Sequence, residues 1–110
     1  RGGCRRTWGQ VRSSMLENRW LENVVLMHRE LFGETPARVV LDVGTRDGDD
    51  ADFLVRRLGE YGTTRGVAIE ARHEAALDTR RRHPRLEVIE TAVSNYVGRA
   101  DFLEITAAHK

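Results

Sequence analysis

One segment near the middle of this chain carries its strongest structural signal: Val39-Val40-Leu41-Asp42-Val43-Gly44-Thr45-Arg46-Asp47-Gly48. Its apolar first half is typical of a strand in a parallel sheet, and we expect residues 38–43 to be buried on both faces. An acid and two spaced glycines after such a strand indicate a turn into a helix beside a bound nucleotide. An ordinary strand-to-helix turn with an acidic cap would have the same sequence pattern. The choice between such a turn and a nucleotide site therefore depends on other segments of the chain.

The segments on either side alternate between strand and helix patterns. Right-handed crossovers between such strands give an open parallel sheet, so residues 36–110 are predicted to form a partial Rossmann-like α/β domain with flanking helices. Asp49 or Asp50 would cap the first crossover helix. The expected elements are a strand at 38–43, a helix at 48–58, a strand at 65–70, a helix at 73–82, a strand at 86–90 and an edge strand at 100–105.

The residues before this domain show two other patterns. Residues 1–13 are rich in arginine and glycine and have no periodicity, so we expect a flexible basic arm. Ser14 and Glu17 then fit a capping box, and apolar residues recur at helical spacing as far as Gly33. The sequence therefore predicts an N-terminal helix within residues 14–35.

Composition narrows the class of protein. The chain has 110 residues, 40% of them hydrophobic and 32% charged, which suits one globular domain. Its longest apolar runs have about four residues, too few to cross a bilayer. The net charge of +1 gives no general attraction to nucleic acid, and Cys4 has no second cysteine for a disulfide. We therefore expect no nucleic-acid or membrane partner, and a cytoplasmic location.

The loop after the first strand discriminates among nucleotide ligands. A nicotinamide fingerprint needs glycine where Arg46 stands, which disfavours a nicotinamide oxidoreductase. A pyrophosphate would meet the negative charges of Asp47, Asp49 and Asp50 at the helix N-terminus. A nucleoside ligand without phosphates suits this loop better, and S-adenosylmethionine is such a ligand.

Two further strand ends carry residues suited to the same ligand. Glu70 ends the second predicted strand, where a carboxylate can accept hydrogen bonds from vicinal ribose hydroxyls. Thr91 and Ala92 follow the third strand, where small residues leave room for one wall of an adenine slot. Either feature alone also fits an ordinary loop, but their repetition at consecutive strand ends favours a cofactor site.

The order of these motifs resembles that of the FkbM-type methyltransferases. These are class I, S-adenosylmethionine-dependent enzymes that mostly methylate hydroxyl groups, with a pattern of roughly LDVGANxG, then xxEPxP, then AVSDxxGxAxF. The resemblance covers about residues 39–105. The matching segments are Val40-Leu41-Asp42-Val43-Gly44-Thr45-Arg46-Asp47-Gly48, Gly66-Val67-Ala68-Ile69-Glu70-Ala71, and Leu86-Glu87-Val88-Ile89-Glu90-Thr91-Ala92-Val93-Ser94 with Gly98-Arg99-Ala100-Asp101-Phe102.

The resemblance implies a role for particular residues. It assigns Asp42, Gly44 and Gly48 to the glycine-rich cofactor loop, Glu70 to the ribose, and Ala92 to the adenine-side wall. The chain departs from the family where Thr45-Arg46 replaces Ala-Asn, Ala71 replaces proline, and Asn95 replaces aspartate. The predicted cofactor site consists of Asp42, Gly44, Thr45, Arg46, Gly48, Glu70, Ala71, Thr91 and Ala92.

The family's next strand carries an acidic motif and much of the substrate wall, and the chain contains no counterpart. We therefore expect the N-terminal half of such an enzyme, whose acceptor would be a hydroxyl of a small molecule or sugar, and we assign no catalytic residue. A Rossmann-like binding or assembly module that has lost methyl transfer is the alternative. In either case the strand at 38–43 would present an unpaired apolar edge, which predicts that the chain either self-associates through this edge or is a portion of a longer protein.

The histidines show no metal-ligand spacing, so we predict no metal site. His73 and His83 are expected to lack carboxylate partners. The basic cluster at residues 80–85 is expected to be a solvated helix end, because its charges complement the helix dipole.

Overall fold

The computed structural model describes residues 8–101 and 103, in two compact units, Arg1–Thr35 and Pro36–Lys110. In the first unit, helix α1 (Trp8–Phe32) ends at Gly33, whose φ of 62° is left-handed as expected for a C-terminal stop. The expectation of a flexible arm is wrong for residues 8–13, which belong to the helix; residues 1–7 lie outside the described part. No described helix is long and apolar enough to cross a membrane.

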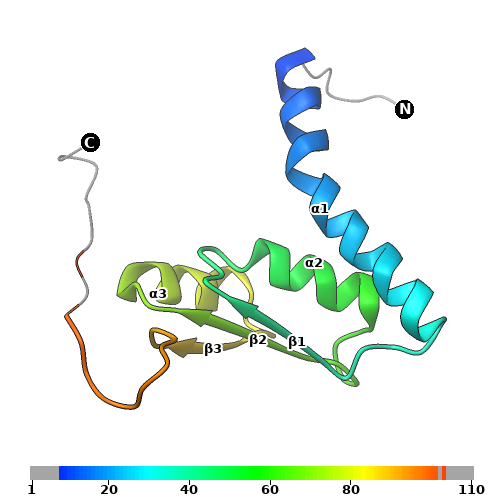
Figure 1. The fold of residues 1–110 in the computed structure, drawn as a ribbon. Helices are drawn as coiled ribbons and strands as arrows, with labels where there is room; N and C mark the ends of the chain where they lie inside the picture. The colour runs from blue at the N-terminus through cyan, green and yellow to red at the C-terminus, as the bar shows by residue number, and fades with distance from the viewer. Residues whose placement is uncertain (1–7, 102, 104–110) are drawn as a thin grey trace. The chain divides into compact units, whose positions relative to one another are not determined.

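The second unit contains a parallel sheet with two crossover helices (Figure 1). Its elements are β1 (Val39–Val43), α2 (Asp49–Leu58), β2 (Arg65–Glu70), α3 (His73–Arg82) and β3 (Glu87–Glu90). The strands lie in the order β1-β2-β3, and both neighbouring pairs are parallel. The Rossmann-like α/β class is thereby confirmed, and each of these elements lies within one residue of its predicted bounds.

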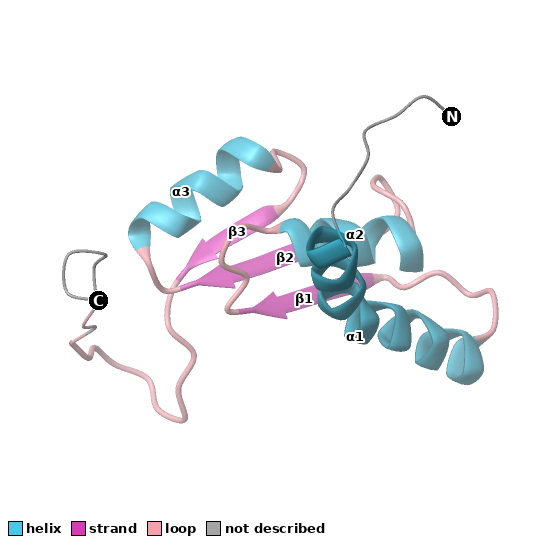
Figure 2. Ribbon diagram, turned by 90° about the horizontal axis from the view of Figure 1, so that it is seen from above, coloured by secondary structure: helices cyan, strands magenta, loops and turns pink. Residues whose placement is uncertain are grey.

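Both crossover helices lie on the same face of the sheet (Figures 1 and 2). The chain moves from β1 to β2 to β3 in one direction, and right-handed crossovers taken in one direction return over the same face. The hydrophobic core forms between that face and the helices. Its buried residues are Val40, Ala51, Val55, Ala68 and Leu86.

The opposite face of β1 is largely uncovered within the described residues. Val39, Leu41 and Val43 are 52%, 59% and 54% exposed, whereas Val40 is buried against the core. The expectation that residues 38–43 are buried on both faces is therefore wrong for this part of the chain. The apolar run suggested a two-sided strand, but α2 and α3 cover only one side.

The start of α2 also differs from its prediction. Neither Asp49 nor Asp50 is the N-cap; that position belongs to Gly48, which has a φ of 84° and no side chain to offer. The carboxylate of Asp47 accepts the N–H of Asp49 at 3.0 Å instead. A carboxylate one residue before the cap thus supplies the acceptor that the glycine lacks.

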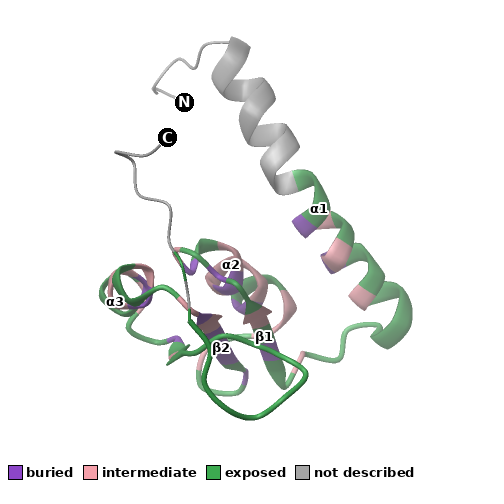
Figure 3. Ribbon diagram, turned by 60° about the vertical axis from the view of Figure 1, so that its left-hand side comes forward, coloured by how far each residue is buried: buried purple, intermediate pink, exposed green. Residues whose placement is uncertain are grey.

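Beyond β3 the chain is irregular where it is described. Residues 91–101 are exposed throughout and follow the sheet as a long loop (Figure 3). The expected edge strand at 100–105 is absent at residues 100, 101 and 103, and its other residues lie outside the described part. Within this run Asp101 has low strand propensity, which weakens it as a strand.

Candidate functional site

The carboxyl ends of the parallel strands meet at one edge of the sheet, and the predicted cofactor residues gather there. Val43 at the end of β1 is paired with Ile69, and Glu70 at the end of β2 is paired with Glu90. The N–H of Thr91 donates to the carbonyl of Glu70 at 3.1 Å, which ties the third strand end to the second. In open α/β sheets, ligands bind outside this edge.

The loop after β1 turns tightly and is anchored to β2. The N–H groups of Gly44 and Thr45 both donate to the carbonyl of Ile69, at 2.8 and 3.1 Å. Gly44 has a φ of 77°, and a Cβ placed on it would meet no atom within 4 Å. Backbone conformation therefore explains this glycine, and the space beside it is open to a ligand.

Gly48, which the resemblance assigns to the cofactor loop, is explained in the structure by packing. The residue is buried. A Cβ here would lie 2.7 Å from Cγ2 of Thr79 and 2.8 Å from Cδ2 of His83. Both neighbours belong to α3 or its C-cap, so the glycine allows α3 to pack against the loop.

Asp42 is the acid that ends the apolar run, and it is half-buried. The hydroxyl of Thr45 is buried and donates to Oδ2 of Asp42 at 2.8 Å. One carboxylate oxygen is thus held by the loop, while a carboxylate has further lone pairs to offer an ammonium or hydroxyl group. Thr45, where the family pattern has alanine, fixes the orientation of this acid.

Glu70 is 7% exposed and links two loops through its carboxylate. Oε1 accepts the N–H of Arg46 at 2.8 Å, and Oε2 accepts the N–H of Arg72 at 2.9 Å. Each oxygen still has a lone pair, so hydroxyl groups of a ribose can be added without breaking either bond. The carboxylate is therefore a brace in this structure as well as a candidate ligand group.

Arg46 has a largely exposed side chain. The side chain is 81% exposed, and its guanidinium lies 3.9 Å from the carboxylate of Asp47. Only the backbone of Arg46 faces Glu70. The large cation that departs from the FkbM pattern is thus exposed to solvent beside Asp47.

The start of α2 adds negative charge to this edge. Burial, followed by the nearby charges of Asp42, Asp47 and Asp49, raises the pKa of Asp50 above its ordinary value, against a smaller lowering by Arg46. After burial, the rise comes from three neighbouring carboxylates, whose negative charges would also repel a phosphate. Such an edge favours a cationic ligand over a phosphate.

The two residues predicted to form the adenine wall are less buried than Asp42 and Glu70 are. Ala71 is half-buried beside Glu70, and Thr91 and Ala92 are exposed. Three residues of this kind and exposure do not by themselves form a wall, so the adenine wall stays a prediction.

Sequence reasoning missed two histidine–carboxylate pairs. Nδ1 of His73 lies 2.9 Å from Glu90, and Nε2 of His83 lies 2.8 Å from Asp49. The expectation that these histidines lack carboxylate partners is wrong, because the crossovers bring together residues far apart in the chain. The signal for the first pair was the position of Glu90 at the same sheet edge as His73. Among residues 8–101 and 103, no group of three or more potential ligands could hold a metal ion.

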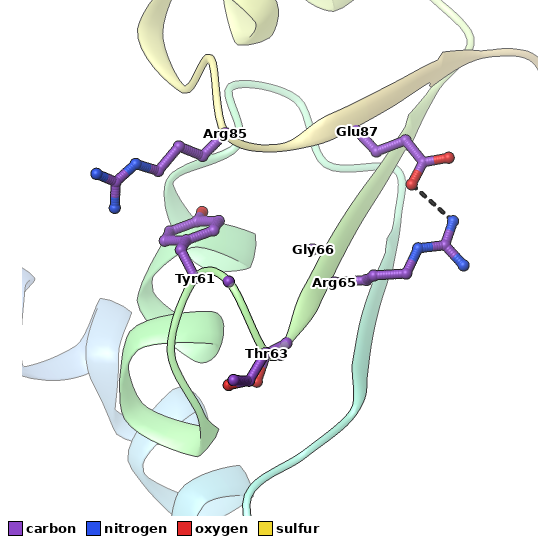
Figure 4. A pocket seen from close by; sticks show the side chains of 8 residues that line it. Tyr61, Thr63, Arg65, Gly66, Arg85 and Glu87 are labelled. Atoms are coloured by element: carbon purple, nitrogen blue, oxygen red, sulfur yellow. Dashed lines mark hydrogen bonds and ion pairs between the residues drawn. The ribbon is translucent and has the colours of Figure 1, made fainter.

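A cavity of about 590 Å³ lies at the opposite, amino-terminal edge of the sheet (Figure 4). The ring of Tyr61 forms one wall, with the guanidinium of Arg85 5.4 Å from its centroid. Arg65 and Glu87 face each other across β2 and β3 as an ion pair of 2.7 Å. None of the predicted cofactor residues lines this cavity.

Comparison with known proteins agrees with the fold. The class that the fold defines is the Rossmann-like α/β proteins, and a methyltransferase is among those that share this arrangement. The solved structure in question is the plantazolicin methyltransferase BpumL in complex with a triazolic desmethylPZN analog and SAH, with a TM-score of 0.58 and 21% sequence identity. The match covers 80% of this chain but only 36% of BpumL, so the chain spans about a third of that enzyme's length. No family model and no curated protein matches the chain.

Proposed function

We propose that this chain is the S-adenosylmethionine-binding part of a methyltransferase. The observation that carries the proposal is the convergence at one sheet edge of the open side of Gly44, the oriented carboxylate of Asp42 and the buried carboxylate of Glu70. The shared fold with BpumL, whose structure contains SAH, supports the same assignment.

Charge favours this cofactor over a dinucleotide. S-adenosylmethionine carries a sulfonium and an ammonium group and no phosphate, so it suits an edge where the carboxylates of Asp42, Asp47 and Asp49 lie near Asp50. In the proposed complex Asp42 accepts from the ammonium group and Glu70 accepts from the ribose hydroxyls. Repulsion between Arg46 and the sulfonium is reduced, because the guanidinium is exposed to solvent and lies 3.9 Å from the carboxylate of Asp47.

The order of motifs supports a finer proposal, an FkbM-like O-methyltransferase. In that reaction the methyl group passes from the sulfonium sulfur to an acceptor oxygen, and the hydroxyl proton leaves to a base or to solvent. The acceptor would be a small-molecule or sugar hydroxyl, held by parts of the protein that the described residues do not include. We assign no catalytic residue and propose a cytoplasmic site of action.

Calorimetry of the chain with S-adenosylmethionine, S-adenosylhomocysteine and NAD tests the proposal. An intact family member is expected to bind with a dissociation constant near micromolar, about −8 kcal/mol, and this chain more weakly. Binding of both sulfur ligands without binding of NAD supports the assignment. Equal binding of NAD, or no heat with any of the three, contradicts it.

A non-catalytic Rossmann-like module is the second candidate. It is favoured by the fact that Asp42 and Glu70 already accept hydrogen bonds from Thr45, Arg46 and Arg72, so the loop is ordered by the chain's own groups. Absence of sulfur-ligand binding by a stably folded chain is the result that would select this candidate.

Self-association through β1 belongs to the same proposal. Among the described residues β1 pairs with β2 alone, and three of its five residues expose apolar side chains on the uncovered face. We propose that a second copy of the chain pairs with this edge. Sedimentation should show a concentration-dependent dimer that Leu41→Lys reduces, and a monomer at all concentrations would contradict it.

A further inference from the structure

Arg46 has an unusual backbone for a residue with a side chain. Its φ is 62°, and it is the one non-glycine residue with positive φ in the part of the chain that the structure describes. L-residues disfavour this left-handed region, so a chain that adopts it is held there by its surroundings. Arg46 lies between Gly44 and Gly48, at the tip of the proposed cofactor loop.

Both polar groups of the Arg46 backbone have partners from different elements. Its N–H donates to Glu70 at the end of β2, at 2.8 Å. Its carbonyl accepts from the hydroxyl of Thr79 on α3, at 3.2 Å. The peptide groups on the two sides of Arg46 are therefore fixed from the sheet and from the second crossover helix.

Thr79 meets this loop with both branches of its side chain. Oγ1 lies 3.2 Å from the Arg46 carbonyl and 2.8 Å from the carbonyl of Ala75, so its one proton is shared between the two. Cγ2 lies against Gly48, where a Cβ on the glycine would approach it to 2.7 Å. Thr79 is fully buried, with 0% exposure, although it is polar.

We propose that Thr79 is a positioning residue for the cofactor loop. It acts through the hydroxyl contact with the Arg46 carbonyl, and keeps the left-handed turn that leaves the open side of Gly44 toward the ligand. The inference rests on the proposed function for its consequence in binding, but its structural part stands on the geometry of the loop alone. If Thr79 only filled space, valine would serve equally well at this position, because valine has the shape of threonine without the hydroxyl.

Three variants distinguish a role of the Thr79 hydroxyl from a role of its shape alone. Thr79→Val removes the hydroxyl and keeps the shape, whereas Thr79→Ser keeps the hydroxyl and removes the methyl group. Thr64→Val is the matched control, because Thr64 is also a buried threonine whose hydroxyl donates to a backbone carbonyl, that of Ala37 at 2.6 Å, at the opposite edge of the sheet.

Amide hydrogen exchange of residues 44–48 is the first readout, since it needs no ligand. Thr79→Val should speed exchange in this loop by about tenfold, which corresponds to one lost hydrogen bond of about 1.4 kcal/mol. Thr79→Ser should stay near the wild-type rate, and Thr64→Val should leave this loop unchanged while lowering the melting temperature. Should Thr79→Val not fold, Thr79→Ala and Thr79→Ser provide the same comparison.

Calorimetry with S-adenosylhomocysteine is the second readout. Thr79→Val is expected to weaken binding about five- to tenfold, with Thr79→Ser and Thr64→Val close to wild type. Unchanged loop exchange in Thr79→Val, or an equal effect of Thr64→Val, overturns the inference. If the wild-type chain binds no S-adenosylhomocysteine, the proposed function fails, and the exchange data still decide whether Thr79 holds the loop.

Discussion

At the scale of single residues, Glu70 shows how one buried carboxylate can prepare a binding site. Its oxygens accept N–H groups from Arg46 and Arg72, which belong to the loops after β1 and β2. The two loops are therefore ordered relative to each other before any ligand binds, which lowers the cost of ordering them in a complex. The remaining lone pairs lie at the sheet edge where a ribose is expected.

Asp50 gives a prediction of pH dependence. Because its pKa is raised in the folded chain, the folded state binds the proton more tightly than the unfolded state, whose pKa is near the ordinary 3.8. Ionisation of Asp50 thus lowers stability as pH rises from below 3.8 through the folded-state pKa, and the loss persists at neutral pH. Asp50→Asn should therefore raise the melting temperature at pH 7, with a smaller gain as pH falls toward 4.

The control for this prediction is Asp78→Asn on α3. The side chain of Asp78 is 49% exposed and lies 4.0 Å from Arg82. Removing its charge should therefore change the melting temperature little at either pH. A lower melting temperature of Asp50→Asn at pH 7, or a gain that grows on acidification, would contradict the account.

The two loop glycines should respond differently to alanine. In Gly44→Ala the new Cβ meets no neighbour. This variant should lose only about 1–2 kcal/mol of unfolding free energy, from the strain of the left-handed backbone. Gly48→Ala also forces a Cβ against Thr79 and His83, which adds about 1–3 kcal/mol of overpacking. Urea unfolding measures both, and equal costs would mean that α3 does not pack on Gly48 as described.

At the scale of elements, β1 has two unlike faces. Val40 packs under α2 in the core, while Leu41 is 59% exposed on the uncovered side. Val40→Ala should therefore cost about 2 kcal/mol of unfolding free energy, and Leu41→Ala no more than about 0.5 kcal/mol.

Dilute protein is needed for this comparison, because the proposed dimer would cover Leu41. A cost of Leu41→Ala that grows with protein concentration agrees with pairing through β1. A large cost at all concentrations would show that this face is covered within a single chain.

At the scale of the whole molecule, the sequence predicted the elements that follow local patterns. The valine-rich run at β1, the glycines after it and Glu70 at the end of β2 were enough to place three parallel strands and their shared edge. These features depend on periodicity and on residues close in the chain, which a sequence displays directly.

Features that depend on distant pairs were not predictable in the same way. The packing of Gly48 against Thr79, and the pairing of His73 with Glu90, require the path of α3 over the sheet. The exposed face of β1 was missed because an apolar run does not tell which of its faces the crossover helices will cover. Each of these depends on crossover geometry, which local patterns do not contain.

In the proposed complex, the carboxyl edge of the sheet holds S-adenosylmethionine through Glu70. This mode of binding is tested most directly by calorimetric titration of S-adenosylhomocysteine into the wild-type chain, Glu70→Ala, and Glu87→Ala as a matched control. Glu87 is a carboxylate on β3 that pairs with Arg65 at the amino-terminal edge of the sheet. This edge is opposite to the proposed site, so the loss of Glu87 should leave cofactor binding unchanged.

We predict that Glu70→Ala weakens binding by at least about tenfold, because two charge-assisted hydrogen bonds to the ribose and the brace between the loops are lost together. Thermal unfolding of the same variants establishes that they are folded at the temperature of the titration. Binding by folded Glu70→Ala with the affinity of the wild-type chain would contradict the claim.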